Sequence, residues 1–234
     1  MGGLGGHMDH IYDNQNLTFD EVVSILNAAT NAELDVEEKV DGQNLLISYS
    51  LKRKSTVAAR NLGNIRKGGL DAHGMAEKFV GHAAEKVFLE GFSAFETAIE
   101  SLPEANIIEI FGEDAEIWYN SELMDPDNPN IISYDSKIIK IHDTGHLRMP
   151  KGANRPEPYD ASQNLVVFDR FLDKMKTELE GKSEFSLARR AVIALQKMDD
   201  DVPYKKAQED IDIALADVSL GRGATILQYI RKRL

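Results

Sequence analysis

The alternation of apolar and polar positions changes period along the chain and predicts an α+β fold. Residues 18–31 open with a Thr-x-x-Glu capping box and carry apolar residues at helical spacing, which predicts a helix. Residues 35–50 alternate instead, which predicts one or two strands with a kink at Gly42. Residues 55–61 predict a partner strand that completes a hairpin, and a glycine-rich loop is expected after it.

The middle of the chain is expected to combine a long helix with three strands. Apolar side chains at helical spacing run from 74 to 102, and Pro103 ends the pattern. Residues 143–160 contain several glycines and prolines and are expected to form a long loop. The three strands are predicted at 106–111, 117–124 and 131–141.

The last third of the chain has a different pattern, which predicts a mainly helical region. One helix is expected near Leu165, a second begins at Pro203, and a short last helix covers 225–233. Residues 185–198 fit either a helix or a strand. The expected organisation is an expression-derived segment at 1–8, a core at 9–160 and a helical insertion or appendage at 161–234.

Composition and charge exclude several classes of protein and of functional site. The 234 residues include 27 Lys and Arg against 39 Asp and Glu, and a net charge of −12 argues against indiscriminate coating of nucleic acid. The absence of cysteine excludes disulfides, thiolate metal sites and cysteine nucleophiles, and it fits a reducing cytoplasm. We expect no signal peptide at residues 1–8, and the sequence has no run of about 18 apolar residues. We therefore expect a cytoplasmic protein that contacts no membrane.

Basic residues nevertheless gather in and after the predicted hairpin. This cluster predicts local contact with a nucleic-acid backbone, and an ordinary solvated surface is the alternative. Its members are Lys52, Arg53, Lys54, Arg66 and Lys67.

The segment Glu38-Lys39-Val40-Asp41-Gly42-Gln43-Asn44 is the strongest chemical signal. Strand alternation puts Lys39 and Asp41 on the same face of a strand that ends at a glycine. A lysine so placed can act as a nitrogen nucleophile once it has lost its proton. The alternative is a surface lysine beside an Asp-Gly turn.

This segment resembles motif I of the covalent nucleotidyltransferases, the superfamily of ATP-dependent DNA ligases, RNA ligases and mRNA capping enzymes. Asn44 makes it most similar to the type-2 RNA ligases of bacteriophages. Three further segments follow in the order of the family. Ala58–Asn61 resembles the arginine motif, Tyr119–Glu122 resembles motif III, and Lys137–His142 stands where motif IIIa is expected.

The resemblance implies both a chemistry and a fold. Lys39 would attack the α-phosphorus of ATP and keep AMP as a phosphoramidate, with Mg²⁺ beside the triphosphate. The implied fold is α+β, with antiparallel sheets around a nucleotide cleft, and the implied partner is nucleic acid with broken or nicked ends. The resemblance assigns no metal ligand. The implied nucleotide contacts are Glu38, Asp41, Gly42, Asn44, Arg60, Asn61, Glu122, Ile141 and His142.

Two later motifs of the family, a Glu-Gly-(Ile/Val)-Val strand and a Lys-x-Lys strand, do not occur in the sequence. Asn164–Phe168 is the only later apolar run that resembles such a strand, and Lys205-Lys206 lies in a helical pattern. The chain would then be a ligase-like enzyme completed by a downstream segment or a partner. The alternatives are an inactive ligase-fold module that binds nucleotide or protein, a GTP-using capping-type enzyme, and a structural protein that assembles through its C-terminal helices.

Overall fold

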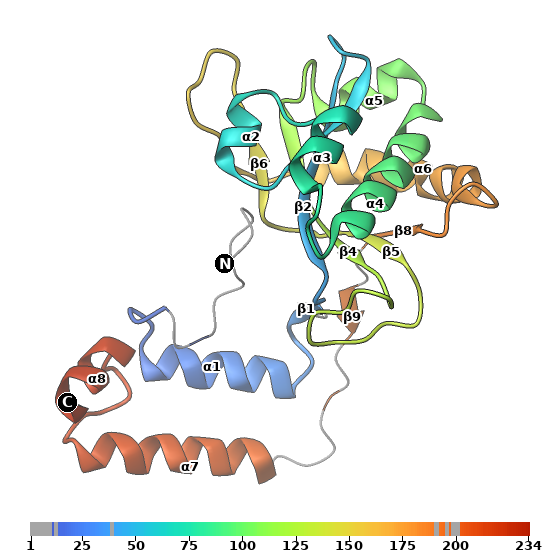
Figure 1. Ribbon diagram of the computed structural model, residues 1–234. Coiled ribbons are helices and arrows are strands. Elements are labelled where there is room, and N and C mark those ends of the chain that lie inside the picture. Colours follow the sequence, from blue (N-terminus) through green and yellow to red (C-terminus); the bar gives the residue numbers. More distant parts are fainter. Residues whose placement is uncertain (1–10, 12–13, 38–39, 190–191, 195–196, 198–201) are drawn as a thin grey trace. The chain divides into compact units, whose positions relative to one another are not determined.

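The computed structural model shows a mixed α+β protein, which confirms the predicted class (Figure 1). The chain divides into two compact units. The first contains Lys39–Arg190, and the second combines Met8–Glu38 with Ala191–Leu234. The boundary expected near residue 160 falls inside the first unit, and the expected segment 1–8 lies outside the described residues. The residues that the structure describes are 11, 14–37, 40–189, 192–194, 197 and 202–234.

The first unit is built on an open mixed sheet. The central strand order is β3-β2-β4-β5-β8, while β6 pairs with the beginning of β4 and β7 pairs with β6. Among the described strands, only β5 and β8 pair in parallel, because the chain between them crosses over through a helix. The sheet therefore differs at this pair from the antiparallel arrangement implied by the resemblance. The strands are β2 (Gln43–Ser50), β3 (Ser55–Ala59), β4 (Ile117–Met124), β5 (Ile138–Ile141), β6 (His146–Arg148), β7 (Glu157–Tyr159) and β8 (Ser186–Arg189).

Helices cover the two faces of this sheet unequally. The longer helices build the main core with Leu45 and Ile47 of β2 and with Tyr119 of β4. On the other face Leu46 and Trp118 pack against Ile65 of the short helix α2. Further along this second face, toward β5, the strand residues are polar. The helices are α2 (Leu62–Arg66), α3 (Ala72–Phe79), α4 (Glu85–Glu100), α5 (Glu104–Phe111) and α6 (Ser162–Leu179).

Two of the predicted strands were wrong in whole or in part. Residues 106–111 lie in helix α5, because a short apolar run fits a buried helix as well as a strand. The strand predicted at 131–141 is shortened to β5, since its first residues form a loop that bonds to Asp41.

Several boundaries also differ from the sequence pattern. The single helix predicted at 74–102 is two helices, α3 and α4, separated by a turn in which Gly81 has a φ of +74°. The run Asn164–Phe168 belongs to helix α6, and the loop predicted at 143–160 contains the short strands β6 and β7.

The second unit joins the two ends of the chain. The predicted capping box of Thr18 and Glu21 is present, and β1 pairs antiparallel with β9 so that Glu37 lies opposite Val192. Helix α1 packs against α7. None of the described helices is long and apolar enough to cross a membrane. The elements are α1 (Phe19–Thr30), β1 (Asp35–Glu37), β9 (Val192–Ala194), α7 (Val202–Asp217) and α8 (Ile226–Arg233).

Candidate functional site

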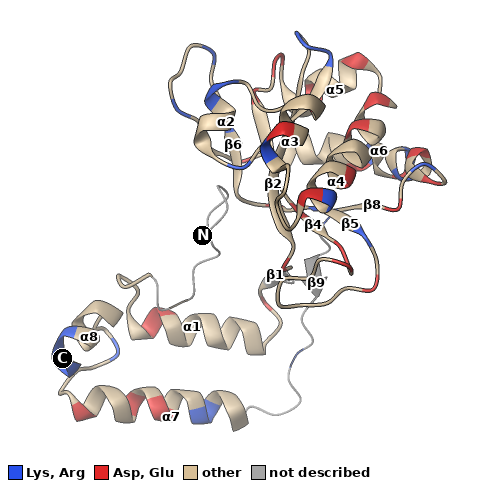
Figure 2. Cartoon of the chain, in the orientation of Figure 1, with Lys and Arg blue, Asp and Glu red and all other residues tan. Residues whose placement is uncertain are grey.

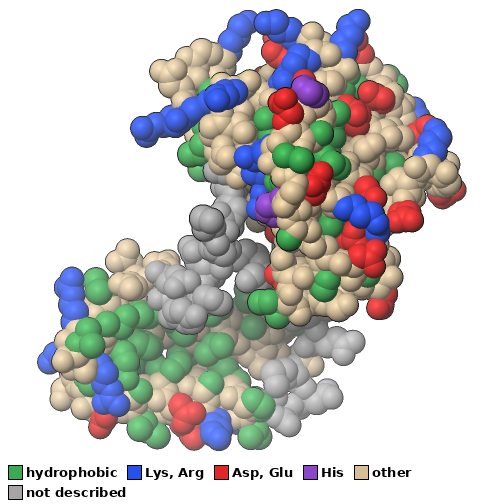
Figure 3. Space-filling model, in the orientation of Figure 1, with side chains coloured by type: hydrophobic (Ala, Val, Ile, Leu, Met, Phe, Trp, Pro, Cys, Tyr) green, Lys and Arg blue, Asp and Glu red, His purple; other side chains and the backbone are tan. Residues whose placement is uncertain are grey.

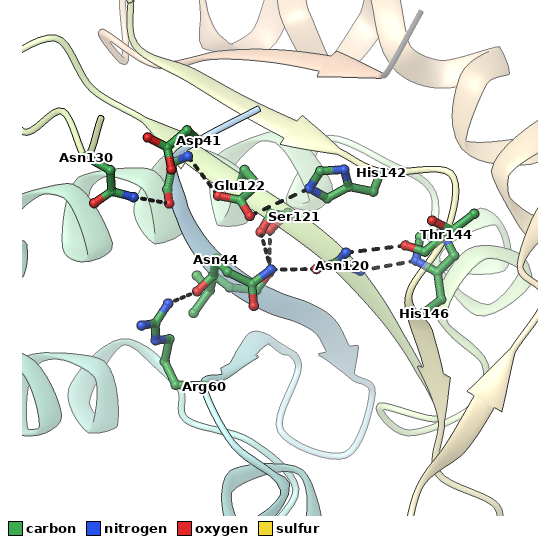
Figure 4. Close-up of polar contacts among 12 residues, drawn as sticks. Asp41, Asn44, Arg60, Asn120, Ser121, Glu122, Asn130, His142, Thr144 and His146 are labelled. Carbon is green, nitrogen blue, oxygen red and sulfur yellow. Dashed lines mark hydrogen bonds and ion pairs between the residues drawn. The ribbon is translucent and has the colours of Figure 1, made fainter. Parts of the chain in front are cut away.

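The candidate site lies where β2 begins, immediately after the segment that carries Lys39. The strand register sets Asn44 opposite Glu122 and Glu122 opposite Lys140. Because directly opposed residues share a face of the sheet, these three side chains lie on the polar second face. Figure 4 shows how the neighbouring side chains gather around Glu122.

Glu122 connects two of the predicted segments through its carboxylate. The backbone N–H of Gly42 donates to Oε2 at 2.9 Å, and Nε2 of His142 lies 3.9 Å from Oε1. The side chains of Glu122 and His142 keep 16% and 11% of their surface exposed, so both are accessible from one side. Gly42 is required here because a Cβ would lie 2.6 Å from the carbonyl oxygen of Leu123.

Arg60 fixes a positive charge beside the same strand. Its Nη1 donates to the carbonyl oxygen of Asn44, and its Cζ lies 4.8 Å from the ring centroid of Phe88. Burial lowers the pKa of Arg60, and the negative charge of Glu122 opposes that shift. A guanidinium stays protonated under such conditions, so Arg60 presents fixed donors for an anion.

The carboxylate of Asp41 faces a loop of its own unit. Its Oδ2 accepts hydrogen bonds from the backbone N–H groups of Ile131 at 2.6 Å and Ile132 at 3.1 Å. The N–H of Asp41 donates to the hydroxyl of Tyr134 at 2.7 Å. The observed contacts of Asp41 therefore hold the chain in place, and the nucleotide contact expected of it stays a prediction.

Other predicted residues lie elsewhere or outside the described chain. Glu38 and Lys39 are outside the described residues. Ile141 is fully buried in the main core on the opposite face of the sheet, so its side chain does not join the site. The side chain of Asn61 accepts from the N–H of Asn64 at 2.9 Å and caps helix α2.

Two polar residues of the site were missed by the sequence analysis. The amide of Asn120 accepts from Nδ2 of Asn44 at 2.6 Å and donates to the carbonyl of Thr144 at 3.3 Å. Lys140 stands opposite Glu122 on β5. Both could have been found from alternation alone, because residues two apart on a strand share a face.

His146 holds Asn120 in place, and its burial leads us to expect a loss of stability in acid. The residue is 2% exposed, and its Nδ1 accepts from the N–H of Asn120 at 3.1 Å. Burial lowers the pKa of His146 to about 4, with the nearby charge of Arg189 acting in the same direction. The ordinary histidine pKa is about 6.5, so between those values the unfolded chain binds a proton that the folded chain excludes.

The free energy of unfolding should therefore have its full value above about pH 6.5 and should decrease as the pH falls toward 4. At pH 5 we expect a loss on the order of 2 kcal/mol relative to pH 7, measured by urea unfolding. His146→Asn keeps an acceptor at the position of Nδ1 and cannot titrate, so it should flatten the pH dependence. An unchanged dependence in this variant would show that other groups cause it.

The basic residues surround a different part of the second face. Lys52, Arg53 and Lys67 line a hollow of about 350 Å³ together with Ser50, Gly68, Asp114 and Ala115. Lys54 lies in the turn of the hairpin and Arg66 ends helix α2, and both are exposed. Figure 2 shows basic residues over α2 and the hairpin turn, and Figure 3 shows their side chains extending from the surface.

Within the described part of the chain, no three His, Asp or Glu side chains are grouped closely enough to hold a metal ion. Comparison of the chain with protein-family models, curated proteins and solved structures finds no match.

Proposed function

We propose that this protein is a ligase-like nucleotidyltransferase that forms a covalent lysyl-AMP at Lys39 and acts on nucleic-acid ends. One observation supports the proposal above all. Four segments far apart in the sequence, represented by Gly42, Arg60, Glu122 and His142, meet around the start of β2. They are the four segments that resemble the family's motifs, and they converge on the residues that follow Lys39.

The site residues suit the proposed reaction. Neutral Nζ of Lys39 attacks the α-phosphorus of ATP, and the bond to the bridging oxygen breaks as the P–N bond forms. Pyrophosphate leaves with the electron pair, and Nζ releases one proton to water to give the phosphoramidate. Arg60 offers fixed donors to phosphate or ribose oxygens, and Glu122 can accept from the ribose hydroxyls. The proposal includes magnesium, which binds the triphosphate of ATP and would neutralise part of its negative charge.

Covalent labelling tests this function directly. We expect incubation with ATP labelled at the α-phosphate and magnesium to leave label on the denatured protein. The label should be absent from Lys39→Ala and present in Lys78→Ala, which removes an exposed lysine of α3. Label from GTP alone would favour the capping-type alternative. No label at any pH from about 6 to 9, combined with an ATP-induced rise in melting temperature, would favour an inactive nucleotide-binding module.

The charge distribution supports nucleic acid as the second substrate. Although the chain holds 39 acidic residues, none lies between Asp41 and Asp71, and that stretch contains six basic residues. Ser50 and Asn44 stand at even positions of β2, so the basic hollow and the candidate site share a face. Asn44 and Ser50 are six residues apart on β2, so at ~3.3 Å per residue the candidate site and the basic hollow are separated by about 20 Å.

This separation predicts a length threshold in binding. A duplex rises about 3.4 Å per base pair, so roughly six pairs on one side of a nick reach the hollow. We expect duplexes with 12 pairs on each side of a nick to bind about tenfold tighter than those with 4. Lys52→Ala/Lys67→Ala should remove that advantage and reduce the salt slope of log K by about two.

The matched control is Lys78→Ala/Lys174→Ala, which removes two exposed lysines from α3 and α6 of the same unit. Fluorescence anisotropy across a salt series measures the affinity of the wild type and of the two double variants for each duplex. Equal losses in the two double variants would contradict a specific role for the hollow.

A further inference from the structure

The loop between β4 and β5 folds over the chain segment that follows Lys39. Nδ2 of Asn130 donates to the carbonyl of Gly42 at 2.8 Å, and its Oδ1 accepts from Nε2 of Gln43 at 2.9 Å. The hydroxyl of Tyr134 accepts from the N–H of Asp41 at 2.7 Å. Together with the two amides that bind the Asp41 carboxylate, the loop bonds to three consecutive residues.

Apolar burial cannot account for the position of this loop tip. Ile131 is 93% exposed and Ile132 is 45% exposed, so neither contributes much to a core. The hydrogen bonds to residues 41–43 are the contacts that fix the tip. A loop held in this way orders the segment it bonds, because each bond restricts the backbone at Asp41 and Gly42.

Order in this segment affects any chemistry at Lys39. Only Val40, which is 6% exposed, separates Lys39 from Asp41. Gly42 additionally donates to Glu122, so a shift of the segment would also move the lysine relative to that carboxylate. Reactive groups held in position save the entropy of finding it, and a displacement of about 1 Å can cost roughly a hundredfold in rate.

We propose that residues 130–134 form a clamp that fixes the segment carrying Lys39, with Asn130 and Tyr134 as positioning residues. This inference rests on the proposed function for its catalytic consequence. Neither residue is assigned a part in making or breaking bonds. The clamp acts through the backbone of Asp41 and Gly42 and the side chain of Gln43.

Single-turnover labelling with ATP tests the clamp. In Asn130→Ala and Tyr134→Phe the rate constant at saturating ATP should fall about tenfold, while the ATP concentration for half-maximal rate changes less than about threefold. Simple destabilisation would instead lower the labelled amplitude, because unfolded molecules do not react. Ile131→Ala is the matched control, since it trims an exposed side chain of the same loop and keeps the N–H that binds Asp41.

Each outcome separates the clamp from the function. Slower rate constants in both variants, with Ile131→Ala unaffected, support the clamp. Labelling of both variants at the wild-type rate overturns it and leaves the proposed function standing. If the wild-type chain takes no label, the function fails, and hydrogen exchange of residues 40–44 then decides. Faster exchange in Asn130→Ala and Tyr134→Phe than in Ile131→Ala supports the clamp, and equal exchange overturns it.

Discussion

Glu122→Ala is expected to lower the rate of Lys39 labelling by about a hundredfold or more. The substitution removes the acceptor of the Gly42 N–H, 2.9 Å away, and the negative charge that faces Arg60. It also removes the carboxylate proposed to bind the ribose hydroxyls. The loss combines a displaced segment, an unbalanced cation and a missing ligand contact, so it should exceed the effect of either clamp variant.

Two further variants show how much of the loss in labelling rate comes from the charge of Glu122 and whether it is specific to this carboxylate. Glu122→Gln keeps a carbonyl oxygen that can accept from Gly42 but removes the charge, so an intermediate rate is expected. Glu116→Ala removes a carboxylate just before β4 that pairs with Arg148, and it should label normally. Rates are measured by single-turnover labelling with melting temperatures recorded in parallel. Wild-type labelling by Glu122→Ala would remove this carboxylate from the proposed site.

Gly69→Ala should lower the free energy of unfolding of the first unit by about 3 kcal/mol. A Cβ at this position would lie 2.6 Å from Cη2 of Trp118 and 2.8 Å from Cβ of Val57. Both neighbours are fully buried, so they cannot move aside without opening the smaller core. Gly69 also has a φ of +85°, a conformation that costs alanine about 1 kcal/mol.

Gly81→Ala isolates the backbone part of this cost. Gly81 has a φ of +74°, and nothing lies within 4 Å of the position its Cβ would take. It should lose only about 1 kcal/mol, compared with the sum of strain and overlap at Gly69. Urea unfolding gives both values. Equal losses would mean that Trp118 and Val57 accommodate the extra methyl group.

The sequence predicts the local elements where a pattern is long or has an end signal. Helix α1 follows from its capping box and its apolar spacing, and the hairpin of β2 and β3 follows from alternation around a charged turn. Helix α5 was wrongly predicted as a strand, because a segment of six residues with four apolar side chains is too short to distinguish the two. The pairing of β5 with β8 depends on contacts across almost fifty residues, which no local pattern records.

The candidate site could be predicted at the level of segments and less well at the level of side chains. Motif order pointed to Arg60 and Glu122. Arg60 reaches the start of β2 through its hydrogen bond to Asn44, and Glu122 reaches it through the strand register. Ile141, which the resemblance included, is buried on the opposite face, and alternation puts its neighbour Lys140 on the face of Glu122. The clamp could not be predicted, because Asn130 and Tyr134 act through backbone groups about ninety positions away.

The pairing of β1 with β9 makes the first unit an insertion within the second. During synthesis α1 leaves the ribosome long before its partner α7 has been made. The packing of α1 against α7 can therefore form only after most of the chain has been synthesised. Closing a flexible loop of about 150 residues costs roughly 4 kcal/mol, whereas a folded insert can shorten that loop. The second unit should therefore assemble last, and its stability should depend on the inserted unit having folded first.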